Sequence, residues 1–238
     1  MNAITVRSLS FAYHDGTRAL NDVSFSVAEG ECVGVIGPSG AGKSTLLLHL
    51  NGILPERLDG TPHVAIFGKD ISPRTLHVIR REAGLVFQNP DDQLFCPTVA
   101  EDVAFGPEQF GLDPEEQANR VRVALAQMGL EGFDARSPHH LSQGEKRRVC
   151  LAGVLACQPR LLLLDEPTSS LDPRARRELI SLVRSLRLTT LVATHDLGLV
   201  ADLCTRVILL NGGTVITDGP TASILGNEMR MEANGLGK

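Results

Sequence analysis

The chain has 238 residues, of which 42% are hydrophobic and 21% are charged, and its formal net charge is −5. These values are typical of a soluble globular protein with one or two domains and argue against a disordered chain. The longest apolar run, Val149–Cys157, has nine residues against the roughly 18 that a membrane-spanning helix needs, which excludes a membrane pore formed by this chain alone.

Short strands are predicted for the N-terminal part of the chain. Ile4–Val6 and Val23–Val27 alternate apolar and polar side chains, as antiparallel strands with one exposed face do. Cys32–Ile36 is apolar and runs into glycine, which is typical of a buried strand that leads into a loop and a helix. No basic region followed by a long apolar core precedes these strands, so we expect no secretory signal.

The loop after this strand matches the phosphate-binding pattern G-x-x-x-x-G-K-[ST], with the helix Ser44–Leu50 behind it. Its glycines let the backbone wrap around phosphate oxygens with the N–H groups pointing inward. We expect Lys43 to reach the β and γ phosphates and the Ser44 hydroxyl to bind Mg²⁺. The strand, loop and helix together indicate a nucleotide site rather than an ordinary glycine-rich turn. The predicted nucleotide-binding residues are Gly37, Pro38, Ser39, Gly40, Ala41, Gly42, Lys43, Ser44 and Thr45.

The middle of the chain, residues 89–157, is predicted to be mainly helical. Asp113-Pro114 is a typical helix start, and Ala118, Val121, Leu125 and Met128 follow at helical spacing as a packing stripe. A second helix over Val149–Cys157 follows the segment 141–145, Leu-Ser-Gln-Gly-Glu. Ser142 and Glu145 fit a capping box, which stabilises a helix by about 1 kcal/mol without any ligand. A helix N-terminus is also a good place for a γ-phosphate, so the segment fits both interpretations.

The last part returns to alternating strands and helices. Leu161–Leu164 is a buried strand that would deliver Asp165 and Glu166 to the carboxyl edge of a sheet. Asp165 would hold Mg²⁺ through water, and Glu166 would polarise the attacking water. Alone, this pair favours a strand-end turn, but the upstream phosphate loop overturns that interpretation, because a nucleotide site needs a carboxylate for its metal.

The remaining elements indicate an α/β fold. A helix follows Asp172-Pro173, Thr189–Thr194 is a β-branched strand, and Val207–Leu210 with Thr214–Ile216 is a hairpin. This alternation predicts a mainly parallel sheet with both faces covered, interrupted by the helical insertion. The tail after Gly226 has little pattern and is expected to be loosely held.

The cysteines and the paired histidines give no clear site. The cysteines are odd in number, widely spaced and without a C-x-x-C pair, so we interpret them as reduced, mostly buried side chains of a cytoplasmic protein. His139 and His140 are adjacent and lack a third ligand, which is weak evidence for a metal site. The cysteines are Cys32, Cys96, Cys150, Cys157 and Cys204.

From about residue 4 to residue 225, the chain resembles the nucleotide-binding subunit of ATP-binding cassette (ABC) transporters. The signature 141–145 departs from the common L-S-G-G-Q at Gln143 and Glu145. The resemblance implies a P-loop NTPase cassette with an N-terminal antiparallel β subdomain, a mainly parallel core sheet and a helical insertion. It implies one domain, 1–238, in which 1–88 and 158–226 form the core and β subdomain, 89–157 the helical subdomain and 227–238 a tail. The resemblance rests on ordered motifs: Tyr13, the loop 37–45, Gln88, 141–145, Asp165, Glu166, 170–172 and His195.

The family pattern implies roles for single residues. Tyr13 would stack on adenine, which contributes about 1–3 kcal/mol. Gln88 would reach Mg²⁺ and the attacking water, and His195 would contact the γ-phosphate and orient Glu166. Two cassettes would pair head to tail around two ATP molecules. The residues that would contact ATP or its partner subunit across that interface are Ser142, Gly144 and Asp172.

Residues 85–112 resemble energy-coupling-factor transporters, especially their cobalt and nickel branch. In those, the ATPase drives a membrane T component and a substrate-capturing S component from the cytoplasmic face of the membrane. Asp91 and Asp92 would meet arginines of the T component, or would form a solvated acidic turn. Other candidates are a vitamin-type or other ABC importer, a soluble ABC ATPase acting on DNA or ribosomes, and a small-molecule kinase. No nucleic-acid partner is expected, because the chain is acidic, lacks Trp and has one Tyr.

Overall fold

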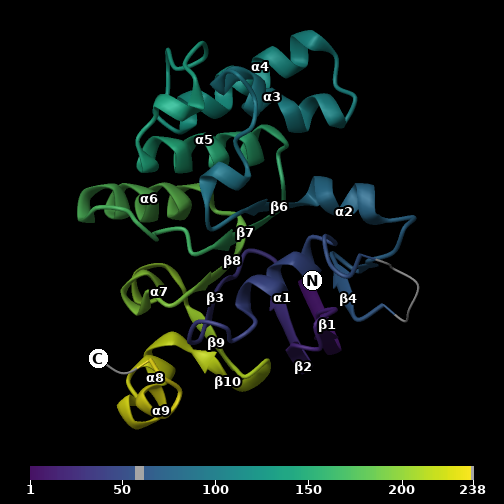
Figure 1. Ribbon diagram of the computed structural model, residues 1–238, viewed down its shortest axis with the longest axis vertical. Helices are drawn as coiled ribbons and strands as arrows, with labels where there is room; N and C mark the ends of the chain where they lie inside the picture. The colour runs from purple at the N-terminus through teal and green to yellow at the C-terminus, as the bar shows by residue number, and fades with distance from the viewer. Residues whose placement is uncertain (57–61, 237–238) are drawn as a thin grey trace.

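The computed structural model describes residues 1–56 and 62–236, which form two sheets with helices around them (Figure 1). The smaller sheet is antiparallel, with the strand order β2-β1-β4-β5. Its inward positions are apolar, which confirms the alternation expected for the first two strands. Its strands are β1 (Asn2–Ala12), β2 (Arg18–Ala28), β4 (Val64–Ile66) and β5 (Lys69–Asp70).

The larger sheet has six strands in the order β10-β9-β3-β8-β7-β6. All neighbouring pairs are parallel except β9 with β10, so the expected mainly parallel sheet is confirmed. The carboxyl ends of β3, β8 and β7 therefore lie side by side, where open α/β sheets bind ligands. The strands are β3 (Cys32–Ile36), β6 (Ala83–Val86), β7 (Leu161–Asp165), β8 (Thr189–Thr194), β9 (Arg206–Asn211) and β10 (Thr214–Pro220).

Two apolar cores cover the two faces of the larger sheet. Along β7, Leu161 and Leu163 join the core that contains the smaller sheet and α1 (Lys43–Leu50). Leu162 and Leu164 join the opposite core. That second core is built with α6 (Pro173–Leu186), α7 (Leu197–Leu203) and the helical insertion. A strand that is buried on both faces has a continuous run of apolar residues in its sequence, as β7 does.

The insertion holds three α-helices, with α5 packed between the other two and the sheet (Figure 1). The apolar stripe of α4 is buried at Val121, Leu125 and Met128, as predicted, but Ala118 is exposed. An alanine methyl carries so little apolar surface that the periodic pattern does not require its burial. The elements are η1 (Pro90–Asp92), α3 (Val99–Gln109), α4 (Pro114–Gln127), η2 (Pro138–His140) and α5 (Gln143–Ala156).

The C-terminal tail is folded, against expectation. Residues 228–233 form α9, Met231 is buried within the second core, and Asn234 accepts a hydrogen bond from the Asn211 amide at 3.0 Å. The helix has one buried side chain and no repeating pattern, so only its tertiary contacts reveal it. Elements that the sequence did not indicate are α2 (Leu76–Glu82), α8 (Thr221–Leu225), α9 (Glu228–Ala233), β4, β5, β6 and α7.

The five cysteines are free thiols, and Cys150 and Cys204 are buried while the other three are partly exposed. Burial raises the pKa of Cys150 to about 12 and that of Cys157 to about 11. Thiols with such values are protonated and unreactive at neutral pH. Across residues 1–56 and 62–236, no helix combines the length and the apolar character needed to cross a membrane.

Candidate nucleotide site

The loop between β3 and α1 is shaped by glycines where no side chain fits. Gly42 caps α1 in the left-handed region at φ 100°, and a Cβ there would collide with the carbonyl oxygen of Ala19. A Cβ at Gly37 would collide with the carbonyl oxygen of Leu210. The loop is also held from outside, because the backbone N–H of Gly213 donates to the Ala41 carbonyl at 3.2 Å. The backbone can therefore curl with its N–H groups inward.

Lys43 extends back over this loop. Its ammonium donates to the carbonyls of Gly37 at 2.9 Å and Pro38 at 3.0 Å and lies 3.8 Å from Glu166 Oε1. Burial lowers the pKa of the Lys43 ammonium, while Glu166 and Asp165 raise it. A phosphate in the loop would offer this charge an anionic partner in place of two neutral carbonyls.

Asp165 ends β7 as a buried carboxylate with a free oxygen. The residue is 7% exposed, and its Oδ1 has no hydrogen-bond partner among the described residues. Burial raises its pKa, and the neighbouring Ser44 hydroxyl and Lys43 partly offset that rise. A buried carboxylate oxygen without a partner costs free energy unless a cation or water binds it. Together with the Ser44 hydroxyl it supplies the oxygen ligands that Mg²⁺ prefers, so these residues fit that metal.

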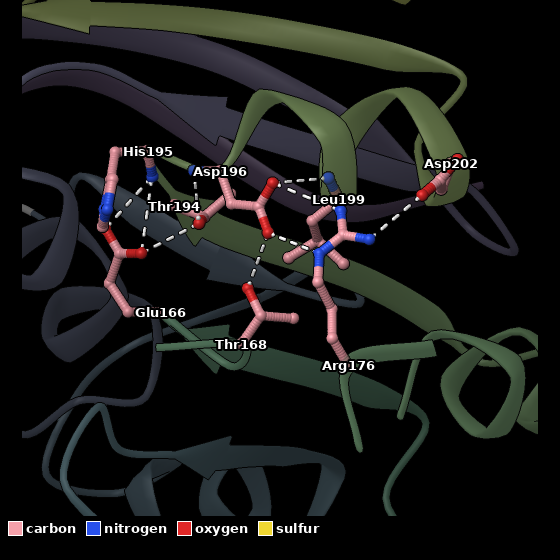
Figure 2. A network of polar contacts seen from close by, with 8 residues as sticks. All are labelled: Glu166, Thr168, Arg176, Thr194, His195, Asp196, Leu199 and Asp202. Atoms are coloured by element: carbon pink, nitrogen blue, oxygen red, sulfur yellow. Dashed lines mark hydrogen bonds and ion pairs between the residues drawn. The ribbon is translucent and has the colours of Figure 1, made fainter. Parts of the chain in front are cut away.

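Glu166 is held in one position by the end of β8 (Figure 2). Its Oε2 accepts from the Thr194 hydroxyl at 2.8 Å, and its Oε1 accepts from the His195 backbone N–H at 3.1 Å. His195 Nδ1 lies 2.8 Å from the same Oε1, and the imidazole is 64% exposed. Glu166 itself adopts φ 44°, an uncommon conformation for a side-chain-bearing residue that recurs at functional sites. The carboxylate thus orients the ring, and the other ring nitrogen makes no hydrogen bond within the described residues.

Tyr13 lies beside the start of α1. Its hydroxyl is 2.9 Å from Thr45 Oγ1, and its ring packs edge to face on Phe11 with centroids 5.0 Å apart. The ring is 40% exposed and borders a cavity of about 560 Å³, which is large enough for a planar base. Leu54, Pro55 and Glu56 also line this cavity, and no pattern in the sequence indicated them.

The structure brings Lys43, Ser44, Asp165, Glu166 and His195 together, and within the described residues no hydrogen bond or ion pair joins four other candidates to this group. One of the four, Gln88, is exposed on the loop after β6. The other three line a separate cavity of about 830 Å³ between α5 and α6, which includes no residue of the phosphate loop. They are Ser142, Gly144 and Asp172.

The two helix caps at this second cavity are formed as the sequence predicts. Ser142 Oγ accepts from the Glu145 backbone N–H at 3.3 Å, and Glu145 Oε2 accepts from the Ser142 backbone N–H at 2.8 Å. Hydrogen bonds from the Ser142 hydroxyl, at 2.6 Å, and from the Ser142 backbone N–H lower the pKa of the Glu145 carboxyl. Asp172 Oδ1 accepts from the N–H groups of Arg174 at 2.8 Å and Ala175 at 3.0 Å. The capping box and the cavity wall are therefore the same residues.

Buried Arg147 was not anticipated from the sequence. Its guanidinium donates to the carbonyls of Phe87 at 3.2 Å and Ser169 at 3.3 Å, so it ties α5 to the loop before Gln88 and to the loop before Asp172. Burial lowers its pKa. In sequence, Arg147 is one of three consecutive basic residues of an amphipathic helix, and only packing distinguishes its role from those of buried Lys146 and partly exposed Arg148.

Comparison with known proteins gives concordant matches. The family model "ABC transporter" matches residues 20–169. A putative ABC transporter ATP-binding protein of Gloeobacter violaceus is 50% identical over 98% of this chain and 95% of its own length. The energy-coupling factor transporter ATP-binding protein EcfA of Methanothermobacter thermautotrophicus is 47% identical over 93% of this chain and 72% of its own.

Two solved structures are similar over nearly the whole chain. The structure of cbiO1 from Clostridium perfringens, part of the ABC transporter complex cbiONQ, has a TM-score of 0.84 and 34% identity over 99% of this chain and 95% of that one. A dimeric ATP-binding cassette in a post-hydrolysis state with ADP and Pi has a TM-score of 0.80 and 29% identity, over 92% of this chain and 98% of that one.

Proposed function

This chain belongs to the ABC transporter family as an ATP-binding, ATP-hydrolysing subunit, and from that premise we propose that it works as a head-to-tail dimer that powers uptake. Two Mg-ATP would lie between the two phosphate loops and the two signature segments. The transporter would be of the energy-coupling-factor type, in its cobalt and nickel branch. One observation carries the dimer: the phosphate loop with its carboxylates and the cavity at Ser142 and Asp172 are separate half-sites on one chain.

The first half-site would act mainly by positioning and charge stabilisation. The loop N–H groups and Lys43 would bind the β and γ phosphates. Ser44, Asp165 and Gln88 would hold Mg²⁺, which supplies charge neutralisation of the phosphate oxygens. Glu166 would orient the attacking water, because Thr194 and His195 fix its carboxylate. His195 would contact the γ-phosphate through Nε2, and Tyr13 would stack on the adenine.

The second half-site would complete the centre of the partner subunit. Ser142 and Gly144 lie at the N-terminus of α5, a helix of 14 residues whose free N–H groups favour an anion. They would contact the γ-phosphate bound to the partner's loop, and Asp172 would contact the partner across the interface. A single chain would then hydrolyse ATP poorly, because half of the ligand's partners are missing.

The surface around η1 and α3 supports docking on a membrane component. Phe95 and Phe105 are 63% and 41% exposed and pack edge to face with centroids 4.9 Å apart. Exposed aromatic pairs of this kind mark interaction sites. Asp91 is already paired with Lys146 at 2.6 Å, which favours an internal role for that residue and leaves Asp92 for an arginine of a T component. The chain would lie at the cytoplasmic face of the membrane, with T and S components as partners.

A Glu166→Gln variant tests the dimer and the hydrolytic role together. We expect it to bind Mg-ATP, to dimerise on it and to lose at least about 100-fold in turnover. Size-exclusion chromatography with saturating Mg-ATP measures dimerisation, and phosphate release measures turnover. A variant that stays monomeric would refute the sandwich.

The transport assignment needs a separate test. We expect co-expression with a membrane T component to yield a complex that co-purifies in detergent, and Phe95→Ser with Phe105→Ser to abolish it. ATP hydrolysis by the isolated variant should be unchanged. Normal co-purification of the double variant would show that this surface is not the docking site, and no complex with the wild-type chain would count against transport.

A further inference from the structure

Outside the predicted catalytic groups, a charged clamp joins α6 to the end of β8 (Figure 2). Arg176 in α6 donates from Nε to Asp196 Oδ2 at 2.9 Å and from Nη2 to Asp196 Oδ1 at 3.3 Å. The third nitrogen, Nη1, lies 3.4 Å from Asp202 Oδ2. The Arg176 and Asp196 side chains are 25% and 27% exposed, so solvent screens the pair less than a fully exposed one. The two parallel hydrogen bonds fix direction as well as distance.

Asp196 connects this clamp to Glu166. Its backbone N–H donates to Thr194 Oγ1 at 3.0 Å, and the same hydroxyl donates to Glu166 Oε2 at 2.8 Å. Its carboxylate also caps α7, accepting from the Leu199 N–H at 2.9 Å, and accepts from the Thr168 hydroxyl at 3.0 Å. Asp196 is also the residue after His195. An unbroken series of hydrogen bonds therefore runs from Arg176 to Glu166.

The chain leaves space for the guanidinium at Gly198. A Cβ built there would lie 3.0 Å from Arg176 Nη2 and 3.3 Å from Asp196 Oδ1. Gly198 has no left-handed backbone that would itself demand glycine. A methyl group at this position would press on the clamp and on little else, which separates the clamp from the general stability of α7.

The same end of α6 lies at the second half-site. Asp172 caps the helix, and Arg176 follows it by about one turn. Ser170 and Asp172 line the cavity that includes Ser142. The two hydrogen bonds of the clamp connect this helix start to Asp196.

We propose that Arg176 is a positioning residue, which holds His195 and Glu166 in register with the interface end of α6. This inference rests on the proposed dimer for its purpose, since Asp172 would meet the partner subunit there. A simple ion pair that only anchors α6 to α7 is the alternative, and such a pair would affect stability without changing the chemical step.

The test compares steady-state ATP hydrolysis of Arg176→Ala, Arg176→Lys and Arg177→Ala, the last being an exposed neighbour on the same helix. We expect Arg176→Ala to lower kcat by at least about 10-fold with KM for ATP within about threefold, because a transition-state group is misplaced while the phosphate loop is intact. Arg176→Lys should recover part of the loss, and Arg177→Ala should match the wild type. A kcat for Arg176→Ala equal to that of Arg177→Ala would overturn the proposal.

Two further variants distinguish a lost positioning contact from a general loss of folding stability. Gly198→Ala adds a good helix former to α7, so we expect an unchanged or higher unfolding midpoint together with a several-fold lower kcat. Unchanged kcat there would overturn the proposal. In a double-mutant cycle, Arg176→Ala and Asp196→Asn should lose less together than the product of their separate losses. Losses that multiply would also overturn it.

The proposed dimer is tested separately. A Glu166→Gln chain with Arg176→Ala should still dimerise on Mg-ATP as Glu166→Gln alone does. Failure of both chains to dimerise refutes the sandwich and not the clamp, because the clamp lies within one chain. Failure of the double variant alone would overturn the positioning role and assign Arg176 to the interface.

Discussion

Replacing Thr194 by valine tests whether the position of Glu166 depends on the end of β8. Thr194 is fully buried, and valine keeps its shape while it removes the hydroxyl. That hydroxyl donates to Glu166 Oε2 at 2.8 Å and accepts from the Asp196 N–H at 3.0 Å. The substitution therefore leaves the Asp196 N–H without a partner and Glu166 Oε2 with only the long contact of 3.4 Å from the His195 N–H.

The two losses set the expected magnitudes. Each unsatisfied buried group costs roughly 1–3 kcal/mol, so Thr194→Val should lower the free energy of unfolding by roughly 2–6 kcal/mol. Glu166 keeps its contacts to His195 at 3.1 and 2.8 Å, so the carboxylate shifts rather than swings free. A displacement of this size lowers kcat by about 10- to 100-fold.

Urea unfolding and steady-state phosphate release measure the two effects, and Thr190→Val is the matched control. Thr190 lies on the same strand, is equally buried and donates its one side-chain hydrogen bond to the Leu188 carbonyl at 3.0 Å. That variant should lose about 1 kcal/mol of stability with kcat unchanged. A Thr194→Val chain that is destabilised yet hydrolyses ATP within twofold of the control would refute the role of Thr194 in placing Glu166.

Two further predictions concern the binding of adenine and the loss of folding stability at acidic pH. Tyr13→Ala should raise KM for ATP by about 5- to 150-fold, from the loss of roughly 1–3 kcal/mol of stacking, with kcat within threefold, and an unchanged KM would place adenine elsewhere. Burial raises the pKa of Asp196, but hydrogen bonds from Arg176, Leu199 and Thr168 outweigh it, so its folded pKa is below 3.8. Its contribution to stability is therefore present above pH 3.8 and is lost as pH falls through the lowered folded pKa. Asp196→Asn should flatten that loss in urea unfolding below about pH 5, and an equal slope in both chains would contradict the assignment.

Local chemistry explains why so much of the site was predictable from the sequence. The phosphate loop, the run Leu161–Glu166 and the capping box at Ser142 are each formed by neighbouring residues, whose spacing fixes their geometry. Strand and helix periodicity then predicted the mainly parallel sheet. Strand β8 was placed at its observed bounds, Thr189–Thr194, because three β-branched threonines and a valine define it.

The elements that were missed are short or depend on distant contacts. Strands β4 and β5 have three and two residues, too few for a periodic pattern. Helix α9 forms because Met231 packs into the core and Asn234 meets Asn211, and neither contact leaves a signal nearby in the chain. Ala118 fits the stripe of α4 by spacing alone, and it is exposed.

The amino-acid composition determined that this chain has enough apolar residues for a core. The sequence also showed none of the long apolar runs that cross a membrane. Its motifs determined which side chains are candidates for binding a nucleotide. Only the tertiary structure decided that the phosphate loop and the cavity at Ser142 and Asp172 lie apart on one chain, and that Arg176 and Asp196 are bound to each other beside Glu166. The physical reason is range: a loop or a cap needs only the residues around it, whereas a clamp joins residues that are 20 positions apart and meet only when α6 packs on the sheet.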